Sequence, residues 1–213
     1  MNIVILGPQG SGKGTQAKLL SEKYGLKRIE AGALVREEAK KDKEIWETIN
    51  VKGKLIPAKK IFELIKREVG SGDNFENIIF DGYPRSLKQY GYYKDWLDET
   101  GSKLNFVIFL KISEDESIKR LSARRSCPEC GTVYNLITNP PQGEKCKCGG
   151  TLVHREDDKP EAIKKRLMEY EEKTKPVVEE FKKEELLLEI DGERPIDVIF
   201  DDIQKKLGEK GIN

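Results

Sequence analysis

Hydrophobic residues gather in five short runs along this chain, and longer amphipathic stretches separate the runs. The runs cover residues 2–6, 77–80, 105–110 and 186–190, with a briefer one at 26–29. Near-continuous apolar runs of this kind are typical of strands that are buried on both faces, as in a parallel sheet. Several of the runs have this pattern, and together with the brief segment at 26–29 they predict five strands.

The stretches between the runs predict helices. Helical periodicity covers residues 31–41, 44–51, 57–69, 86–99, 114–124, 160–183 and 195–207, after a first helix that follows residue 15. Ser86 is a suitable helix cap, and residues 71–74 have the composition of a turn. Strands that alternate with helices predict an α/β fold with a five-stranded parallel sheet, helices on both faces and right-handed crossovers.

The first apolar run leads directly into a glycine-rich segment, GPQGSGKGT, at residues 7–15. A strand, a glycine loop ending in lysine, and a helix are the parts of a phosphate-binding loop, or P-loop. Glycines let successive backbone N–H groups turn toward an anion, and the helix N-terminus adds the positive end of its dipole. We expect Lys13 to supply a full charge to the outer phosphates and Thr15 a hydroxyl near the metal ion.

Two other polar segments follow strands directly, DGYPR at 81–85 and DGERP at 191–195. Because ligands gather at the carboxyl ends of parallel strands, both should meet the P-loop at one edge of the sheet. Asp81 is suited to hold Mg²⁺, directly or through water. Phosphoryl transfer requires alignment and charge neutralisation, which arginines supply. The candidate arginines are Arg85, Arg120, Arg124, Arg125, Arg155 and Arg166.

Composition narrows the classes of function. Of 213 residues, 36% are charged, yet the net charge is only +1, so no global basic field favours nucleic acid or a membrane surface. No apolar run approaches the ~20 residues of a membrane span. Met1 runs straight into the first strand without a leader pattern, so we expect a cytoplasmic protein. His154 is the sole histidine, which argues against a histidine-based catalytic triad.

All four cysteines lie in one short stretch, at Cys127, Cys130, Cys146 and Cys148. Clustered pairs in an intracellular chain indicate a metal site more than disulfides. Four thiolates suit a closed, tetrahedral, structural zinc site, although the second pair has one intervening residue in place of the usual two to four. A zinc ribbon that binds nucleic acid is the alternative, but the stretch lacks a clear basic and aromatic stripe.

Taken together, these motifs resemble the adenylate kinase family in its zinc-bearing long-lid form. The resemblance covers nearly the whole chain through segments in matching order: GPQGSGKGTQ, AGALVR at 31–36, GKLIP at 53–57, DGYPRSLKQ at 81–89, RLSARR at 120–125, REDD at 155–158 and DGERP. It implies the reversible, Mg²⁺-dependent reaction ATP + AMP ⇌ 2 ADP in a monomer. It also implies three parts: a core (1–29, 57–120 and 159–213), an AMP-binding acceptor insertion (30–56) and a mobile zinc-bearing lid (121–158).

The resemblance further implies a division of site residues. Those expected at ATP are Gly10, Ser11, Gly12, Lys13, Gly14, Thr15, Arg120, Arg124, Val133, Tyr134 and Arg194. Those expected at AMP are Ala31, Arg36, Lys54, Leu55, Ile56, Gly82, Tyr83, Pro84, Arg85 and Gln89. Arg155 and Arg166 would reach across the phosphates between the nucleotides, Asp157 and Asp158 would help to close the lid, and the catalytic group would comprise Lys13, Arg85, Arg124, Arg155 and Arg166.

The identity of the acceptor base is the least constrained feature. The family usually has threonine where this chain has Ala31, so one side-chain hydrogen bond to the base is missing. Gln89 favours adenine because its amide matches the donor and acceptor edge of a purine. A kinase that uses CMP or UMP remains an alternative, as does a nucleotide-gated zinc protein that binds nucleic acid. Five arginines near the phosphates argue against the last, because a simple nucleotide switch needs no second nucleotide site.

Overall fold

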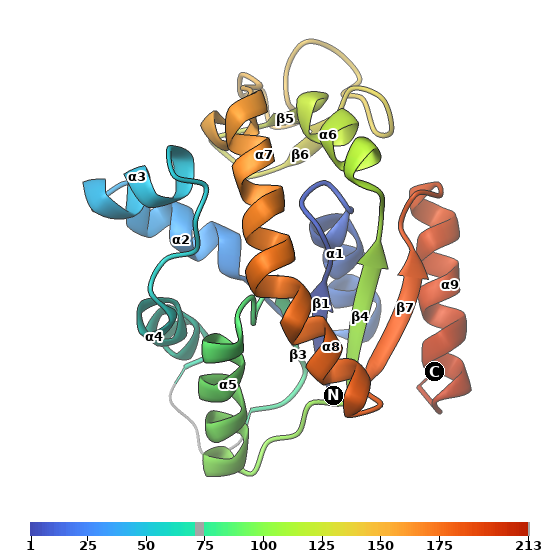
Figure 1. Ribbon diagram of the computed structural model, residues 1–213. Helices are drawn as coiled ribbons and strands as arrows, with labels where there is room; N and C mark the ends of the chain where they lie inside the picture. Colours follow the sequence, from blue (N-terminus) through green and yellow to red (C-terminus); the bar gives the residue numbers. More distant parts are fainter. Residues whose placement is uncertain (71–74, 213) are drawn as a thin grey trace.

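The predicted parallel sheet is present. The fold is a computed structural model that describes residues 1–70 and 75–212, so the turn predicted at 71–74 lies outside the described residues. The sheet is five-stranded and parallel, in the order β2-β3-β1-β4-β7 (Figure 1). Its strands are β1 (Asn2–Leu6), β2 (Lys27–Glu30), β3 (Ile78–Asp81), β4 (Phe106–Lys111) and β7 (Leu187–Asp191).

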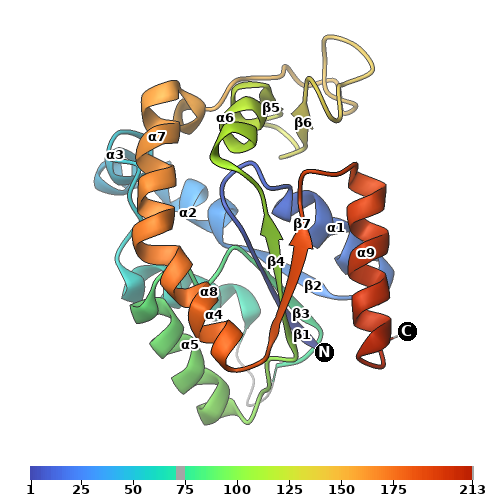
Figure 2. The same cartoon turned by 45° about the vertical axis from the view of Figure 1, so that its right-hand side comes forward.

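Helices cover both faces of the sheet because successive strand residues point to opposite sides. In β1, Ile3 and Ile5 join the core beneath α1 (Lys13–Tyr24) and α9 (Ile196–Glu209). Val4 and Leu6 join the core on the other face, with α4 (Ala58–Val69), α5 (Leu87–Thr100) and α8 (Lys175–Lys183). Figure 2 shows α1 and α9 on one side of the sheet and α5 and α8 on the other. The predicted α/β class is confirmed.

Two segments project beyond the carboxyl ends of the strands (Figure 1). The first, between β2 and α4, contains α2 (Ala31–Ala39) and α3 (Lys43–Asn50). The second follows α6 (Glu114–Ser122) and contains an antiparallel pair, β5 (Arg124–Ser126) and β6 (Val133–Asn135), and a 3₁₀ turn, η1 (Glu156–Asp158). In the described part of the chain no helix has the length and apolar character to cross a membrane.

The helix predicted at 114–124 ends earlier than its pattern suggests. α6 stops at Ser122, and Arg124 belongs to β5, where it pairs with Asn135 of β6. The backbone N–H of Leu136 also donates to the carbonyl of Ala123. Pairing with a distant segment therefore overrides local helical periodicity at this point, and Arg124 is carried on a strand of the second projection.

The helix predicted at 160–183 is continuous but not uniform. α7 (Pro160–Glu169) passes into a π-helical turn, η2 (Tyr170–Thr174), and then into α8. Pro176 lacks an N–H donor and its ring clashes with the preceding turn, so the wider π turn accommodates it. The wide turn also brings the Thr174 hydroxyl to the Arg85 carbonyl, to which it donates at 3.0 Å.

Candidate functional site

The P-loop has the conformation that an anion-binding loop requires. Gly7, Gly10 and Gly12 have positive φ angles of 150°, 83° and 89°, a region that favours glycine. At Gly7 a Cβ would overlap the Leu110 carbonyl. Gly12 is the N-cap of α1 and has no side-chain capping bond, so the first N–H groups of the helix remain available to an anion.

Lys13 lies at the base of this loop with its ammonium enclosed. Its Nζ donates to the Pro8 carbonyl at 2.7 Å. Burial, reinforced by the neighbouring Arg85 guanidinium, lowers the pKa of Lys13 from 10.5 to about 7. A lysine that is desolvated among other cations gains most from an incoming polyanion, since the anion restores the charged form. The position is therefore suited to hold phosphate.

A cavity of about 1560 Å³ opens around the P-loop and extends to both projecting segments. Nearly all the residues predicted at the nucleotides line it, including the P-loop, Arg36, Gln89, Tyr134 and Arg194. Pro84 and Asp158 do not line it, although their neighbours Arg85 and Asp157 do. The structure thus brings segments from across the whole chain to one hollow, as the strand-end argument predicted.

Two partly buried arginines, Arg85 and Arg166, line the same cavity as the P-loop. The Arg85 Nε donates to the Gly82 carbonyl at 2.6 Å, which folds the guanidinium back over its own loop. Arg166 on α7 donates to the Asp157 carbonyl at 2.7 Å and pairs with the Asp157 carboxylate at 3.0 Å. Burial lowers the pKa of both guanidinium groups, and the charge of Arg166 lowers the pKa of Arg85 further. The site accumulates positive charge that a polyphosphate would neutralise.

Asp158 does not line the cavity itself, but it pairs with Arg124 of the lid, which does. It is almost fully buried and accepts from Arg124 Nε at 2.7 Å, from Arg124 Nη2, and from Arg166 at 3.3 Å. Arg155, close by, has its pKa lowered to about 10 by burial and by the positive charges of Arg124 and Arg36. Asp158 therefore positions two arginines at the cavity wall.

The acceptor insertion supplies the opposite wall. Ala31, Val35 and Ile56 give it an apolar surface, and Gln89 lies at its floor. The side-chain oxygen Oε1 of Gln89 accepts from the backbone N–H of Arg85 at 2.7 Å, which fixes the orientation of the side-chain amide. Leu55 N–H donates to Glu169 of α7 at 3.2 Å, so the insertion is in contact with the core helix. A flat, apolar ligand with polar edges fits this wall.

Two charged residues of the site have no counterpart in the predicted set, Arg28 and Glu30. Arg28 donates to the Asp81 carboxylate at 2.5 Å and to Glu30 at 2.9 Å, and all three line the cavity. Asp81, predicted to associate with Mg²⁺, thus already has a cationic partner. The available signal was the spacing of Arg28 and Glu30, which places both on one face of the short strand that borders β3.

Two of the remaining arginines are held by the protein itself. Arg120 is buried and donates to the Gly192 carbonyl and to Glu116, both at 2.7 Å, which ties α6 to the turn after β7. Arg194 pairs with Asp202 at 2.6 Å at the mouth of the cavity. Arg125 turns away and donates to backbone carbonyls of its own segment. Arg120 and Arg194 therefore shape the cavity edge, whereas Arg125 does not line it.

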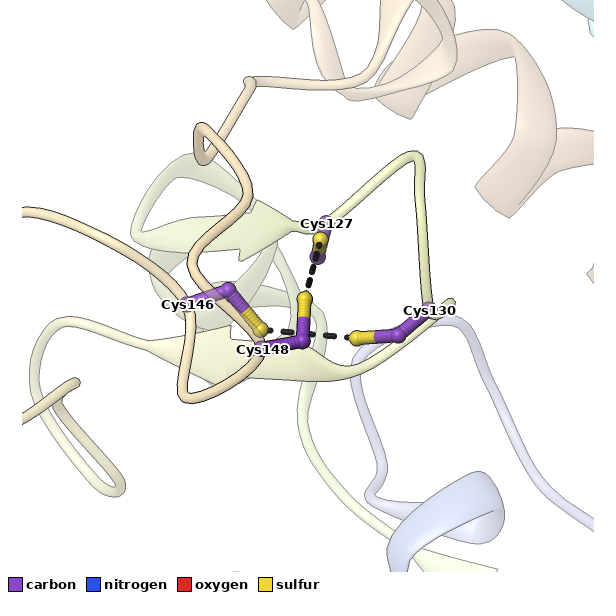
Figure 3. A group of neighbouring side chains, drawn as sticks. All are labelled: Cys127, Cys130, Cys146 and Cys148. Carbon is purple, nitrogen blue, oxygen red and sulfur yellow. Dashed lines mark hydrogen bonds between the residues drawn. The ribbon is translucent and has the colours of Figure 1, made fainter.

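The four cysteine sulfurs converge in the lid, all within 4.8 Å of one another (Figure 3). Cys127 and Cys148 sulfurs are 3.5 Å apart, and those of Cys130 and Cys146 are 3.4 Å apart. Zn–S bonds of about 2.3 Å in a tetrahedron place sulfurs about 3.8 Å apart, so the group fits zinc. The short Cys-x-Cys spacing is accommodated by a tight turn in which Gly149 donates to the Cys146 carbonyl at 2.8 Å.

Comparison with known proteins agrees with this geometry. A model of the family described as "Adenylate kinase" matches residues 5–186. A curated adenylate kinase from Archaeoglobus fulgidus is 38% identical over 209 residues, covering 96% of each chain. One from Methanocella arvoryzae is 40% identical over 209 residues, covering 96% of this chain and 97% of the relative. One from Thermosipho melanesiensis is 39% identical over 208 residues, covering 95% of this chain and 97% of the relative.

Proposed function

The chain belongs to the adenylate kinase family, and from this premise we propose that its cavity binds ATP and AMP together and transfers the terminal phosphoryl group between them. The protein is a phosphotransferase, and the family reaction is the reversible ATP + AMP ⇌ 2 ADP.

The observation that carries the proposal is the size of the cavity together with the positive charge at its centre. At about 1560 Å³ it exceeds the roughly 300–1,000 Å³ of sites for one small ligand, so it has room for two nucleotides. The cations that surround its middle come from the P-loop, the acceptor insertion, the loop after β3, the lid and α7. They are Lys13, Arg36, Arg85, Arg124, Arg155 and Arg166.

In the proposed reaction an oxygen of the AMP phosphate attacks the γ-phosphorus of ATP, and the bond from that phosphorus to the β–γ bridging oxygen breaks. The electron pair of that bond stays on the β-phosphate of the departing ADP. The protein supplies alignment and neutralises charge on the moving group, which is the main requirement of phosphoryl transfer. Lys13 and the P-loop N–H groups hold the donor phosphates, and Arg85 and Arg36 hold the acceptor phosphate.

We assign the two ends of the cavity to the two nucleotides. ATP lies between the P-loop and the lid, with its outer end beside Val133, Tyr134 and Arg194. AMP lies against Ala31, Gln89 and residues 54–56. Arg124, Arg155 and Arg166 span the phosphates between them. The lid and the acceptor insertion exclude water, which protects ATP from hydrolysis.

Two metal ions accompany this function. Mg²⁺ bound with ATP neutralises phosphate charge, and the Asp81 carboxylate offers the oxygen donors that this ion prefers. Zn²⁺ in the four-cysteine group stabilises the lid and has no open coordination position for substrate. Both assignments rest on donor chemistry: a buried carboxylate next to the P-loop, and four converging sulfurs.

We also propose where the protein is located and how it assembles. Four cysteines that are close together yet suited to metal point to a reducing compartment, so we propose the cytoplasm. We also propose a monomer, as the resemblance to the family implies. Nucleic acid is not proposed as a partner, because most arginines of the described chain, all but Arg67 and Arg125, line the cavity.

A panel of acceptors tests the proposal. AMP, CMP, UMP and GMP are each incubated with ATP–Mg²⁺, and products are separated by nucleotide chromatography. We expect rapid ADP formation with AMP and much slower transfer to the pyrimidine nucleotides. A preference for CMP or UMP would favour the alternative kinase, and a salt-dependent shift of an RNA or DNA probe without ADP formation would favour the zinc-protein alternative.

Gln89→Ala sharpens the assignment of the acceptor end. Loss of the amide should lower the efficiency with AMP more than with CMP, because Gln89 reads the purine edge. Gln204→Ala on α9 is the matched control, since Gln204 pairs with surface residues far from the cavity. If Gln89→Ala leaves the ratio of AMP to CMP efficiency unchanged, the base does not lie at Gln89.

A further inference from the structure

Four ionised side chains form a continuous row along the cavity wall, which we call the ion-pair chain: Arg36, Glu30, Arg28 and Asp81. Arg36 pairs with one oxygen of Glu30 at 2.7 Å, and Arg28 pairs with the other at 2.9 Å. Arg28 also pairs with Asp81 at 2.5 Å. Two positive and two negative charges alternate, so the row is neutral as a whole. It links the residue proposed to hold the acceptor phosphate to the carboxylate proposed to associate with Mg²⁺.

The sheet register produces this row. β2 and β3 are parallel, and Glu30 lies opposite Asp81 at the carboxyl ends of both strands. Arg28 is two residues before Glu30, so both side chains lie on the same face of β2, and Asp81 lies on that face of β3. The face is the one covered by α1. Arg28 is therefore placed to reach diagonally to Asp81 while remaining beside Glu30.

The row also reaches the P-loop. A Cβ at Gly14 would lie 3.0 Å from Arg28 Nη2 and 3.4 Å from Asp81 Oδ2. Exposure of the side chains rises along the row, from 6% at Asp81 through 25% at Arg28 and 33% at Glu30 to 36% at Arg36. Burial would raise the pKa of Glu30, but Arg28 and Arg36 hold it below the ordinary value, so Glu30 is ionised. The accessible end is thus the acceptor end.

From this arrangement we propose that Arg28 and Glu30 are positioning residues that couple phosphate binding at Arg36 to cation binding at Asp81. The inference rests on the proposed function, which places the acceptor phosphate at Arg36 and Mg²⁺ at Asp81. A phosphate that takes Arg36 leaves Glu30 with Arg28 as its remaining partner. Arg28 then moves toward Glu30 and releases Asp81, whose carboxylate becomes available to the cation that accompanies ATP.

The coupling follows from competition for one guanidinium. In the structure Arg28 pairs with both Glu30 and Asp81, and Glu30 pairs with both Arg28 and Arg36. Each ion pair in the row therefore competes with another. Removing Arg36 from the row makes Glu30 the stronger attractor of Arg28. Coupling between binding sites is reciprocal, so ATP with its cation should strengthen acceptor binding by the same factor. Typical factors are about 5–150-fold, and we expect about tenfold here.

Mn²⁺ is the probe for the cation site, because its binding is read directly by electron paramagnetic resonance. Its affinity is measured for the protein complexed with a non-hydrolysable ATP analogue, with and without AMP. In the wild type AMP should tighten Mn²⁺ binding about tenfold. The same preparations are assayed separately for ADP formation from ATP and AMP, so that failure of the proposed function is seen independently of failure of the coupling.

Two substitutions should abolish the coupling from opposite starting points. Arg28→Gln frees Asp81, so Mn²⁺ should bind tightly even without AMP. Glu30→Gln leaves Arg28 on Asp81, so Mn²⁺ should bind weakly even with AMP. In both variants the AMP effect should fall below about twofold, as loss of a coupling path requires. Arg28→Lys keeps the charge without the forked donors and should retain part of the effect.

Glu38→Gln is the matched control. Glu38 is also a paired glutamate of the acceptor insertion, bound to Lys60 at 2.6 Å, but it does not line the cavity. Its AMP effect should equal that of the wild type. The proposal is overturned if the wild type shows no AMP effect on Mn²⁺, if the variants keep the wild-type factor, or if both variants shift Mn²⁺ affinity in the same direction.

Discussion

The acceptor insertion and the lid border the same cavity but are held in place by different kinds of interaction. In the acceptor insertion Ala31, Ala39, Ile45 and Ile56 are buried and belong to the hydrophobic core on one face of the sheet. In the lid Val133, Leu136, Ile137 and Val153 are exposed, and Cys127 and Cys146 are among its most buried side chains. One segment extends the main core, whereas the other is organised around sulfur.

The two segments are kept ordered above the cavity in two different ways. An insertion of this length is too short to bury a sufficient core of its own. The apolar side chains of the acceptor insertion pack against α4 and the sheet, which holds the insertion against the rest of the domain. Few apolar side chains of the lid are buried, so we propose that a metal in the four-cysteine group supplies the stabilisation that apolar burial does not. Such a metal would order the lid internally without a hydrophobic core of its own.

Metal removal is expected to have the largest effect and to affect only one of the two segments. Zinc binding contributes about 10–16 kcal/mol in zinc-finger peptides, so a chelator or Cys146→Ser should unfold the lid. Limited proteolysis should cut within residues 121–158 and spare 30–56, and metal analysis should find about one zinc per chain before treatment. A lid that resists protease equally well without metal would contradict this view.

Lys13→Met tests the loop that both segments cover. Loss of the charge should lower turnover by about 10²–10³-fold or more, because the charge stabilises the moving phosphoryl group. Protease sensitivity of both segments should be unchanged. Retained turnover within a few-fold of the wild type would show that Lys13 is not part of the chemistry.

The lowered pKa of Lys13 gives this variant a second, thermodynamic readout. Because the folded-state pKa, about 7, lies below the ordinary 10.5, the unfolded chain binds more protons between these values. Stability of the empty protein should therefore rise with pH across that window, and protonation below pH 7 is unfavourable to the fold. Lys13→Met removes this contribution, so at pH 6 it should melt no lower than the wild type.

Ile45→Ala should weaken the acceptor insertion through the shared core. Ile45 is 7% exposed in α3, and truncation of such a side chain costs about 2–5 kcal/mol. Val133→Ala is the matched change in the lid, where the side chain is 42% exposed and the cost should be within about 0.5 kcal/mol. Guanidinium unfolding measures both, and equal losses would remove the contrast between the segments.

Ala31→Thr is expected to have the smallest effect. A neutral hydrogen bond to the acceptor base contributes about 0.5–1.5 kcal/mol, so the Michaelis constant for AMP should fall roughly two- to twelvefold. Ala33→Thr is the control, because Ala33 does not line the cavity. Initial rates at saturating ATP measure the change. An unchanged constant would mean that the base does not lie against Ala31.

Local patterns were sufficient for the elements that depend on neighbouring residues. The apolar runs predicted β1, β3, β4 and β7, because a buried strand needs mainly apolar residues, and the brief segment at 26–29 predicted β2 although Lys27 and Arg28 interrupt it. The P-loop was recognisable because its glycines, Lys13 and Thr15 act within nine successive residues, 7–15. The four cysteines predicted a metal group because thiolate ligands recur at characteristic short spacings. Ser86 caps α5 as expected, and its hydroxyl accepts from the Gln89 N–H.

Features that depend on distant pairing were decided only by the tertiary structure. α6 ends at Ser122 because β5 finds its partner in β6, and the π turn before Pro176 aims Thr174 at Arg85. Arg28 reaches Asp81 across 53 positions of sequence through the register of β2 on β3. Periodicity reports which face a residue takes within its own element. It contains no information on which element lies beside it, and the ion-pair chain depends on that neighbour.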